Sequence, residues 1–224
     1  MFLGHFGIGF GAKAAAPKVS LGTLFLAAQF IDLLWPTLLM LGVERVNIRT
    51  DGAQYPPLDF VYYPFSHSLL AVLIWAVLLA SVYFAIRRSR AGAVVLGLAV
   101  VSHWLLDLIV HHPDLPLYPP VLPNIGASPL LGFEVWSSPI FEMVLELSIF
   151  ALGVWLYLRT TRAIDVTGKW AVWSLVAFLV AIHLGNTFGP PPPSITALAW
   201  VGQAQWLLVA WAYWVDKHRT QTAR

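Results

Sequence analysis

Residues 68–86 read SLLAVLIWAVLLASVYFAI, which is 19 residues without one charged side chain. A helix needs about 20 mostly apolar residues to cross the hydrocarbon core of a bilayer. Arg87, Arg88 and Arg90 follow directly, and a second apolar run covers residues 91–110. Two apolar runs joined by a short, positively charged turn are typical of consecutive transmembrane helices, so this stretch decides the class of fold.

The rest of the chain repeats this pattern. Further apolar runs of spanning length cover residues 19–43, 139–158, 170–188 and 195–215. Residues 1–12 are apolar and rich in glycine but too short to span, so we expect a half-helix or a re-entrant segment there. A cleaved signal is the weaker alternative, because Lys13 follows this run and does not precede it. We predict an all-α polytopic membrane protein, one integral membrane domain over residues 1–224, with about six transmembrane helices plus a short N-terminal half-helix.

The composition points to the same class. Of the 224 residues, 58% are hydrophobic and 11% are charged, and the mean hydropathy is +0.73, whereas a soluble domain carries roughly 25% charged residues. The net charge of +2 is too small to attract a polyanion, so we expect no nucleic-acid partner. The chain has no cysteine, which excludes disulfides, thiolate metal sites and cysteine nucleophiles. Any bound metal must therefore be held by His, Asp, Glu or water.

Lysine and arginine predict the orientation, because cytoplasmic loops of membrane proteins carry an excess of both. If the turn at 87–90 is cytoplasmic, alternation of the helices places eleven of the 13 Lys and Arg residues on that side and only Arg45 and Arg49 on the other, periplasmic side. The outer loops then cover residues 44–67, 111–138 and 189–194. The first two are rich in proline and tyrosine, so we expect a semi-rigid cap without regular strands.

Ionisable side chains inside apolar runs are costly and usually mark a functional site. His103 and Asp107 lie one helical turn apart, and His111 continues the same face, which aligns three possible metal ligands. The alternative is a His–Asp hydrogen bond that only holds helices together. Asp32 lies in the middle of the first long run, either as part of the site or paired to one polar neighbour. Pro36 should kink that helix beside the carboxylate, because proline cannot donate to the Asp32 carbonyl.

Three more ionisable residues fall towards the outer side of the membrane. His67 lies where the first Pro-rich loop enters the second long run, next to Ser66, which could cap that helix. Glu142 and Glu146 are again one turn apart, near the outer start of residues 139–158. A glutamate near a helix N-terminus can simply interact with the helix dipole, and a histidine at a loop boundary can be only interfacial. The shared depth makes metal binding our hypothesis for all three.

Two further histidines lie within apolar segments. His5 would be about 12 Å above Lys13 if residues 1–12 are helical, at 1.5 Å per residue, and it could approach Asp32 from below as another ligand. His183 lies in the middle of residues 170–188, and Asn186 follows about one turn later. We assign His183 and Asn186 to substrate binding, with a hydrogen-bonded core histidine as the alternative.

Four motifs together resemble a known family. They are MFLGH at 1–5, IDLLWP at 31–36, SHS at 66–68 and SHWLLD at 102–107. In this order they are similar to the bacterial inner-membrane metal-dependent hydrolases of the LexA-regulated YdjM type, and more distantly to zinc-dependent phospholipase C and P1-type nucleases. The resemblance implies a multi-zinc cluster on helices, with these ligands: His5, Asp32, His67, His103, Asp107, Glu142 and Glu146, and His111 or His112 as a further one.

Imidazoles and carboxylates suit zinc, with manganese or iron as alternatives, and we expect one to three ions. We therefore expect a zinc-type phosphoesterase with Asp32 and Asp107 as catalytic residues. Asp107 would bridge ions, and Asp32 would be a ligand or the general base. The substrate would be a lipid or a lipid-linked phosphoester near the outer leaflet of the bacterial cytoplasmic membrane. The alternatives are a transporter or an ion- or proton-conducting protein that uses the same residues, and a structural membrane protein.

Overall fold

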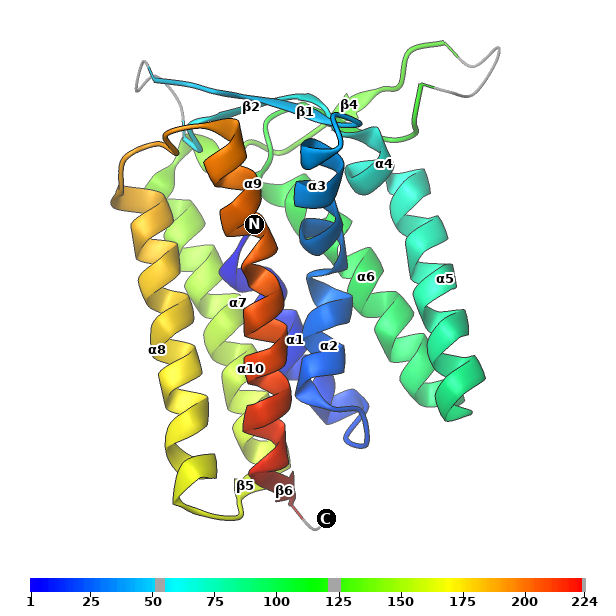
Figure 1. The fold of residues 1–224 in the computed structure, drawn as a ribbon, viewed down its shortest axis with the longest axis vertical. Helices are drawn as coiled ribbons and strands as arrows, with labels where there is room; N and C mark the ends of the chain where they lie inside the picture. Colours follow the sequence, from blue (N-terminus) through cyan, green and yellow to red (C-terminus); the bar gives the residue numbers. More distant parts are fainter. Residues whose placement is uncertain (51–54, 121–125, 223–224) are drawn as a thin grey trace.

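The computed structural model describes residues 1–50, 55–120 and 126–222, most of which are helical (Figure 1). Residues 51–54 and 121–125 of the two Pro-rich outer loops, and residues 223–224, lie outside the described residues. The helices are α1 (Leu3–Ala15), α2 (Leu21–Ala28), α3 (Phe30–Met40), α4 (Pro64–His67), α5 (Leu69–Arg87), α6 (Arg90–Val110), the 3-10 turn η1 (Val135–Ser137), α7 (Pro139–Thr160), α8 (Val166–Phe188), α9 (Ile195–Gln203) and α10 (Gln205–Lys217). The strands are β1 (Arg45–Ile48), β2 (Leu58–Tyr62), β3 (Leu115–Pro116), β4 (Leu130–Leu131), β5 (Thr161–Ala163) and β6 (Arg219–Gln221).

Up to six segments of the described chain are long and apolar enough to cross a membrane. They are α5, α6, α7, α8, the α9–α10 pair over Ile195–Lys217, and the α2–α3 pair taken as one bent span. Apolar side chains cover the outer surface; on α5, Ile74 and Val77 are more than half exposed. An apolar surface of this kind is compatible with the hydrocarbon core of a bilayer. A helix also satisfies its backbone hydrogen bonds internally, as hydrocarbon requires. The prediction of an all-α polytopic membrane protein is confirmed.

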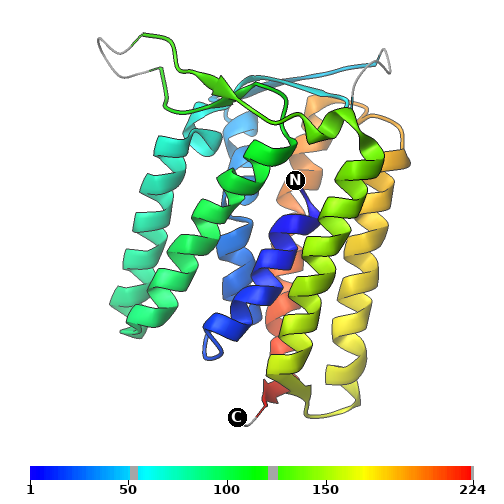
Figure 2. The same ribbon diagram turned by 180° about the vertical axis from the view of Figure 1, so that it is seen from behind.

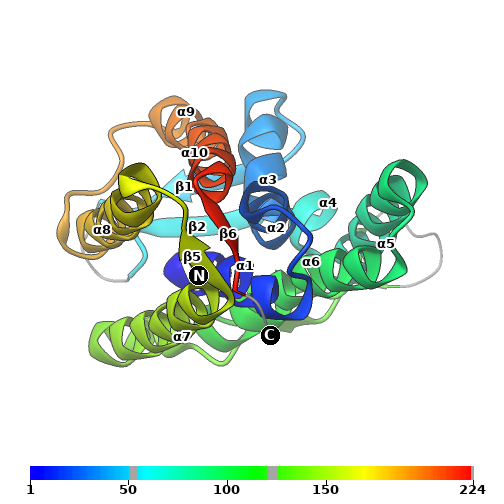
Figure 3. The ribbon, with the colours of Figure 1, turned by 90° about the horizontal axis from the view of Figure 1, so that it is seen from below.

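The short helix α1 is the predicted half-helix, and it packs inside the bundle against α7, α2 and α6 (Figures 2 and 3). It crosses α7 at Gly7 and Gly153, where the two backbones meet: a Cβ atom added at Gly153 would collide with the Gly7 carbonyl oxygen. Close crossings of this kind in membrane proteins depend on small residues. The crossing fixes the position of α1, and so it holds His5 at the level of the site described below.

The helices α2 and α3 meet at a bend of 57°. The position expected for the kink was wrong, because the break falls at Gln29 and α3 continues through Pro36. At the break, the Ala28 carbonyl accepts a hydrogen bond from His103 Nδ1 at 2.9 Å. Carbonyls at a helix end lack a partner within their own helix, so a side chain of α6 stabilises the bend. Asp32 consequently lies in the first turn of α3.

The cap contains short strands, so the expectation of a cap without strands was also wrong. Strand β1 pairs with β2, and β3 pairs with β4, both antiparallel. A two-stranded ribbon leaves one edge of each strand unpaired, and that edge accommodates a proline such as Pro116 in β3. Both ribbons lie across one end of the helices (Figure 1), which we call the outer end.

The opposite, inner end carries the α5–α6 turn and the β5–β6 ribbon (Figure 1). There Lys13, at the end of α1, is buried and forms an ion pair with Asp216 of α10, with 2.7 Å between Nζ and Oδ2. Tyr157 of α7 donates to the other Asp216 oxygen at 3.0 Å. The described Lys and Arg residues lie on elements at this end, except Arg45 and Arg49 in the cap segment. The structure therefore separates positive charge along the bundle as the sequence predicts.

The α1–α7 crossing gives a first prediction. Gly153→Ala should lower the thermal unfolding temperature in detergent, because the new methyl group must push α1 away from α7. Gly97→Ala in α6 is the control, since a Cβ atom there meets its neighbours only at ordinary contact distances of 3.5 and 3.6 Å. Alanine in a helix interior is also favoured over glycine by about 1 kcal/mol. Equal unfolding temperatures for the two variants would contradict the assigned crossing.

The charge separation gives a second prediction, about orientation. Because the chain has no cysteine, a single introduced cysteine reports its own side of the membrane. Ala127→Cys in the cap should react with a membrane-impermeant maleimide in intact cells, and Ala91→Cys at the inner end only after the membrane is opened. Both alanines are exposed. The reverse labelling pattern would overturn the predicted orientation.

Candidate metal centre

A cavity of about 410 Å³ lies between the cap and the helix bundle. Eight of the ten predicted site residues line it: Asp32, His67, Asp107, His111, Glu142, Glu146, His183 and Asn186. They come from α3, α4, α6 and the residue that follows it, α7 and α8. The structure thus gathers residues that are far apart in the sequence around one cavity.

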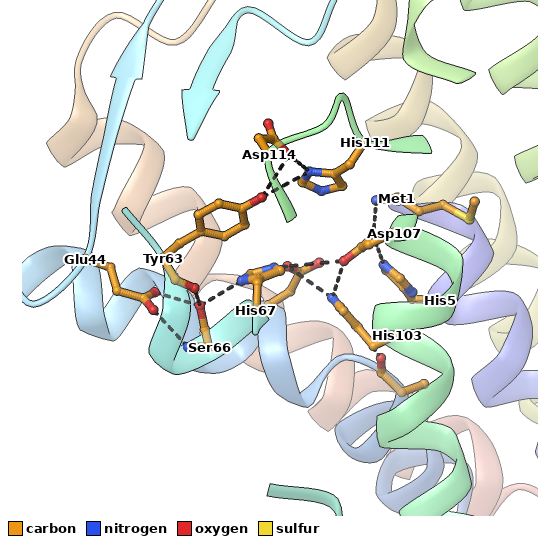
Figure 4. Close-up of polar contacts among 12 residues, drawn as sticks. Met1, His5, Glu44, Tyr63, Ser66, His67, His103, Asp107, His111 and Asp114 are labelled. Carbon is orange, nitrogen blue, oxygen red and sulfur yellow. Dashed lines mark hydrogen bonds and ion pairs between the residues drawn. The ribbon is translucent and has the colours of Figure 1, made fainter. Parts of the chain in front are cut away.

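Two histidines and two carboxylates form the centre of the site; Figure 4 labels three of these residues, His67, His103 and Asp107. His67 Nε2 lies 3.5 Å from Asp32 Oδ1 and 4.0 Å from Asp107 Oδ2. His103 Nε2 lies 3.6 Å from Asp32 Oδ1 and 3.2 Å from Asp107 Oδ2. One ligand atom from each of His67, His103 and Asp107 lies within 4.8 Å of the others. A single ion could contact all three after small side-chain shifts, since zinc–ligand bonds are about 2 Å long.

The hydrogen bond of His103 determines which ring nitrogen carries the proton. Nδ1 lies 2.9 Å from the Ala28 carbonyl oxygen, which can only accept, so Nδ1 is the donor. In the neutral ring Nε2 is then unprotonated, and this buried atom has no hydrogen-bond partner within the described part of the chain. A lone pair that faces the carboxylates of Asp32 and Asp107 is repelled by them unless a cation lies between. The geometry therefore fits a metal ion, and a protonated ring is the competing explanation.

His5 lies directly against His103. The two rings are stacked, with centroids 3.6 Å apart and 8° between the planes, which disfavours a positive charge on both rings. His5 Nε2 lies 3.1 Å from Asp107 Oδ1, and its Nδ1 is buried without a hydrogen-bond partner among the residues described. The amine of Met1 donates to the same Asp107 oxygen at 2.7 Å. Asp107 of α6 is therefore contacted from α1 and α4 as well as from its own helix.

A second group of possible ligands lies at the start of α1. Glu142, Glu146 and His183 each place one ligand atom within 4.8 Å of the others. Glu146 accepts hydrogen bonds from the backbone N–H groups of Phe2 and Gly4 at 2.9–3.0 Å, so it also satisfies the free donors of the α1 N-terminus. Glu142 Oε2 and His183 Nε2 are buried and have no hydrogen-bond partner in the described chain. These two unpartnered atoms make the group a second candidate cation site.

His111 lies in the cavity wall but belongs to a separate network. Its Nδ1 lies 2.8 Å from Asp114 Oδ1, and Tyr63 donates to the same oxygen at 2.9 Å. Burial lowers the pKa of His111. His112 instead lies 3.7 Å from the Glu134 carboxylate. Among the described residues, neither histidine belongs to a group of three ligands within 4.8 Å of one another.

Glu44 is a buried residue that sequence reasoning missed. It accepts hydrogen bonds from the backbone of Phe65 and Ser66 and from the Ser66 hydroxyl, which in turn contacts His67. Burial raises the pKa of Glu44, and these hydrogen bonds oppose the shift. Its sequence neighbours look like those of a solvated loop residue. The only available signal was its position, directly after the first spanning run.

No known family, curated protein or solved structure matches this chain when it is compared with them. The chemistry of the site is therefore the guide to function. The site combines imidazole and carboxylate donors in a buried cavity, the donor set that zinc and similar divalent ions prefer.

The unpartnered nitrogen of His103 gives a third prediction. Protein purified from zinc-supplemented cells should hold at least about one zinc per chain, and His103→Ala should lose one equivalent, because a lone pair is removed from the centre of the site. His218→Ala is the control, since His218 pairs with Asp165 at the inner end. Metal content is measured by elemental mass spectrometry. Metal-free wild type, or equal content in the two variants, would mean that protonated histidines neutralise the carboxylates instead.

Proposed function

We propose that the protein is a membrane-embedded, metal-dependent hydrolase, a zinc-type phosphoesterase that acts on a lipid or lipid-linked substrate near the outer leaflet of the bacterial cytoplasmic membrane. The observation that carries this proposal is the pair of imidazole Nε2 atoms, from His67 and His103, that face the carboxylates of Asp32 and Asp107. Ionisable groups cost at least a few kcal/mol each at membrane depth. Four of them in contact beside a cavity are better explained by a binding site than by helix packing.

The donor set supports zinc, with manganese or iron as alternatives. Three groups of donors are available for one to three ions, and the first two share His103: His67, His103 and Asp107; His5, Asp32 and His103; Glu142, Glu146 and His183. A divalent ion supplies an activated water and stabilises the negative charge that develops on a phosphoester. The residues around it must bind and orient the substrate and accept a proton from water.

The two aspartates differ in exposure, which suggests different roles. The Asp107 side chain is 2% exposed, and its two oxygens face His5 and His103 respectively, which suits a ligand shared between ions. The Asp32 side chain is 21% exposed and lines the cavity, which suits a general base that takes a proton from water. His183 and Asn186 line the same cavity and would contact the substrate.

The apolar wall of the cavity supports an amphiphilic substrate. Trp35, Leu198 and Val201 line it along α3 and α9, and Val201 is 68% exposed on the surface of the bundle. The cavity therefore extends to a side chain that would face lipid, and a hydrocarbon chain could lie there while the phosphoester meets Asp32. The position of the cavity under the cap supports the outer leaflet, given the predicted orientation. The resemblance to inner-membrane hydrolases supports the bacterial cytoplasmic membrane.

A transporter or an ion-conducting protein would need polar groups that continue from the site to the inner end. Between the two, the described core contains the buried rings of Phe10 and Phe25, which pack edge to face, and Phe10 also contacts the Tyr157 ring. The ion pair of Lys13 and Asp216 lies beyond these rings at the inner end. This aromatic layer favours chemistry in a cavity that is closed on the inner side over conduction through the bundle.

The fourth prediction tests the proposed reaction with a panel of lipid and nucleotide phosphoesters. Zinc-loaded wild type should cleave at least one lipid phosphoester, and a chelator should abolish the activity. Asp107→Asn should abolish turnover, because a shared ligand serves more than one ion. Asp32→Asn should lower kcat by about 10²–10⁴-fold, the usual contribution of a general base.

Asp59→Asn is the matched control for both variants. Asp59 pairs with Arg49 in the cap, and alternation along β2 directs it away from the cavity that Leu58 and Phe60 line. Its turnover should equal that of wild type. Zinc-loaded wild type that cleaves nothing in the panel, or Asp107→Asn that cleaves as fast as wild type, would overturn the phosphoesterase proposal.

A further inference from the structure

We propose that Glu44, acting through Ser66, is a positioning residue that keeps the ring proton of His67 on Nδ1. Nε2 of this ring is then free to bind metal. The inference rests on the metal site of the proposed function and adds to it a residue from outside the spanning helices. Glu44 does not line the cavity. Its hydrogen-bonded connection to the site runs through Ser66 to His67.

The turn after α3 places Glu44 beside the start of α4. Gly42 has a φ of +68°, which favours glycine, and it reverses the chain at the end of α3. Glu44 is 1% exposed, and its Oε1 accepts hydrogen bonds from the backbone N–H groups of Phe65 and Ser66 at 2.8 Å each. Its Oε2 accepts from the Ser66 hydroxyl at 2.6 Å. Three donors thus hold the carboxylate in one orientation (Figure 4).

The Ser66 hydroxyl has a single proton, so its contacts determine the tautomer of His67. Ser66 Oγ lies 2.6 Å from Glu44 Oε2 and 2.7 Å from His67 Nδ1. The carboxylate oxygen accepts, so the hydroxyl proton points to Glu44 and a lone pair of Oγ points to His67. Nδ1 must then be the donor, which leaves Nε2 unprotonated and directed at Asp32 and Asp107. Outer partners that fix the tautomer of a metal-binding histidine in this way are a common feature of metal sites.

Glu44→Gln should reverse this order of donors while it preserves the size of the side chain. The glutamine oxygen must face the backbone N–H groups of Phe65 and Ser66, because its NH₂ group there would meet two donors. The NH₂ group therefore faces Ser66 Oγ and donates to it. The hydroxyl proton then has two other acceptors within reach, His67 Nδ1 at 2.7 Å and the Tyr63 carbonyl oxygen at 3.3 Å. The shorter contact favours donation to Nδ1, so the ring proton moves to Nε2, the atom that metal binding requires.

Metal affinity measures these changes. Ser66→Ala removes the partner of Nδ1 and should weaken binding about 10–100-fold, the usual effect of losing a group that orients a ligand. Glu44→Gln should weaken binding further, by up to roughly tenfold, because the ring must also give up a hydrogen bond. Adding Ser66→Ala to Glu44→Gln should raise the affinity back to that of Ser66→Ala, because the hydroxyl that imposes the wrong tautomer is gone.

The probe is cobalt(II), titrated into the metal-free full chain in detergent and followed by the visible absorption of the bound ion. Ser68→Ala is the matched control. Ser68 is as buried as Ser66 and lies two residues further on, but its hydroxyl accepts from Ala71 N at the start of α5. This variant should bind cobalt like wild type. Circular dichroism and thermal unfolding establish that each variant is folded.

The outcomes separate this inference from the proposed function. Wild type that binds no cobalt would overturn both. Wild type that binds cobalt, with Glu44→Gln equal to it, would overturn only the role of Glu44. Losses that add in the double variant would give Glu44 a purely structural role and also overturn the inference. Should Glu44→Gln not fold, the comparison of Ser66→Ala with Ser68→Ala decides, and equal affinities count against the relay.

Discussion

The carboxylate of Asp107 is the charge on which the arrangement of the outer half of the bundle depends. It is buried in a helix of spanning length, where a charge without partners costs several kcal/mol. Groups from three elements surround this carboxylate and offset the cost. They are the Met1 amine and His5 from the α1 end, His103 one turn earlier on α6, and His67 from α4. Each of these elements begins, ends or bends close to the level of this carboxylate. The irregular parts of the bundle are thus concentrated where the charge is.

Several helices begin or break at the depth of Asp107, and their ends leave backbone N–H and C=O groups without partners in their own helix. Polar side chains form hydrogen bonds with these groups. The Ala28 carbonyl at the α2–α3 break binds His103, Glu146 accepts from the first N–H groups of α1, and Glu44 accepts from those of α4. Free backbone groups are tolerated at membrane depth only where protein or a water-filled cavity satisfies them. The same contacts orient the candidate ligands. The hydrogen bonds that satisfy the ends of the interrupted helices are therefore the same ones that build the site.

The spanning helices were predictable because apolar length is a local property. Each of the six expected runs agrees with an observed helix or helix pair to within four residues at either end. The spacing of His103 and Asp107 was enough to place them on one face, because the helical period is fixed. The charge separation between the two ends was also readable, since each Lys and Arg follows or precedes an apolar run.

The helix break and the role of Glu44 were not predictable, because they depend on contacts between distant residues. The break uses a hydrogen bond between Ala28 and His103, which are 75 residues apart, and Glu44 reaches Ser66 across 22 residues. Pro36 does not break its helix, and its ring packs against Gly202 of α9, where a larger residue would collide with it. A local rule for proline cannot include a neighbour that the sequence places far away.

The two groups of candidate ligands both contact the start of α1. Asp107 binds the amine of Met1, and Glu146 binds the N–H groups of Phe2 and Gly4. A cation bound in either group would neutralise charge beside a carboxylate that orders this helix, so the free energy of binding at one group would depend on the other, and the dependence would be reciprocal. Helix α1 is also held by its crossing with α7. A change in packing at that crossing would therefore affect both groups of candidate ligands. A change at Glu44, by contrast, would act on His67 through Ser66.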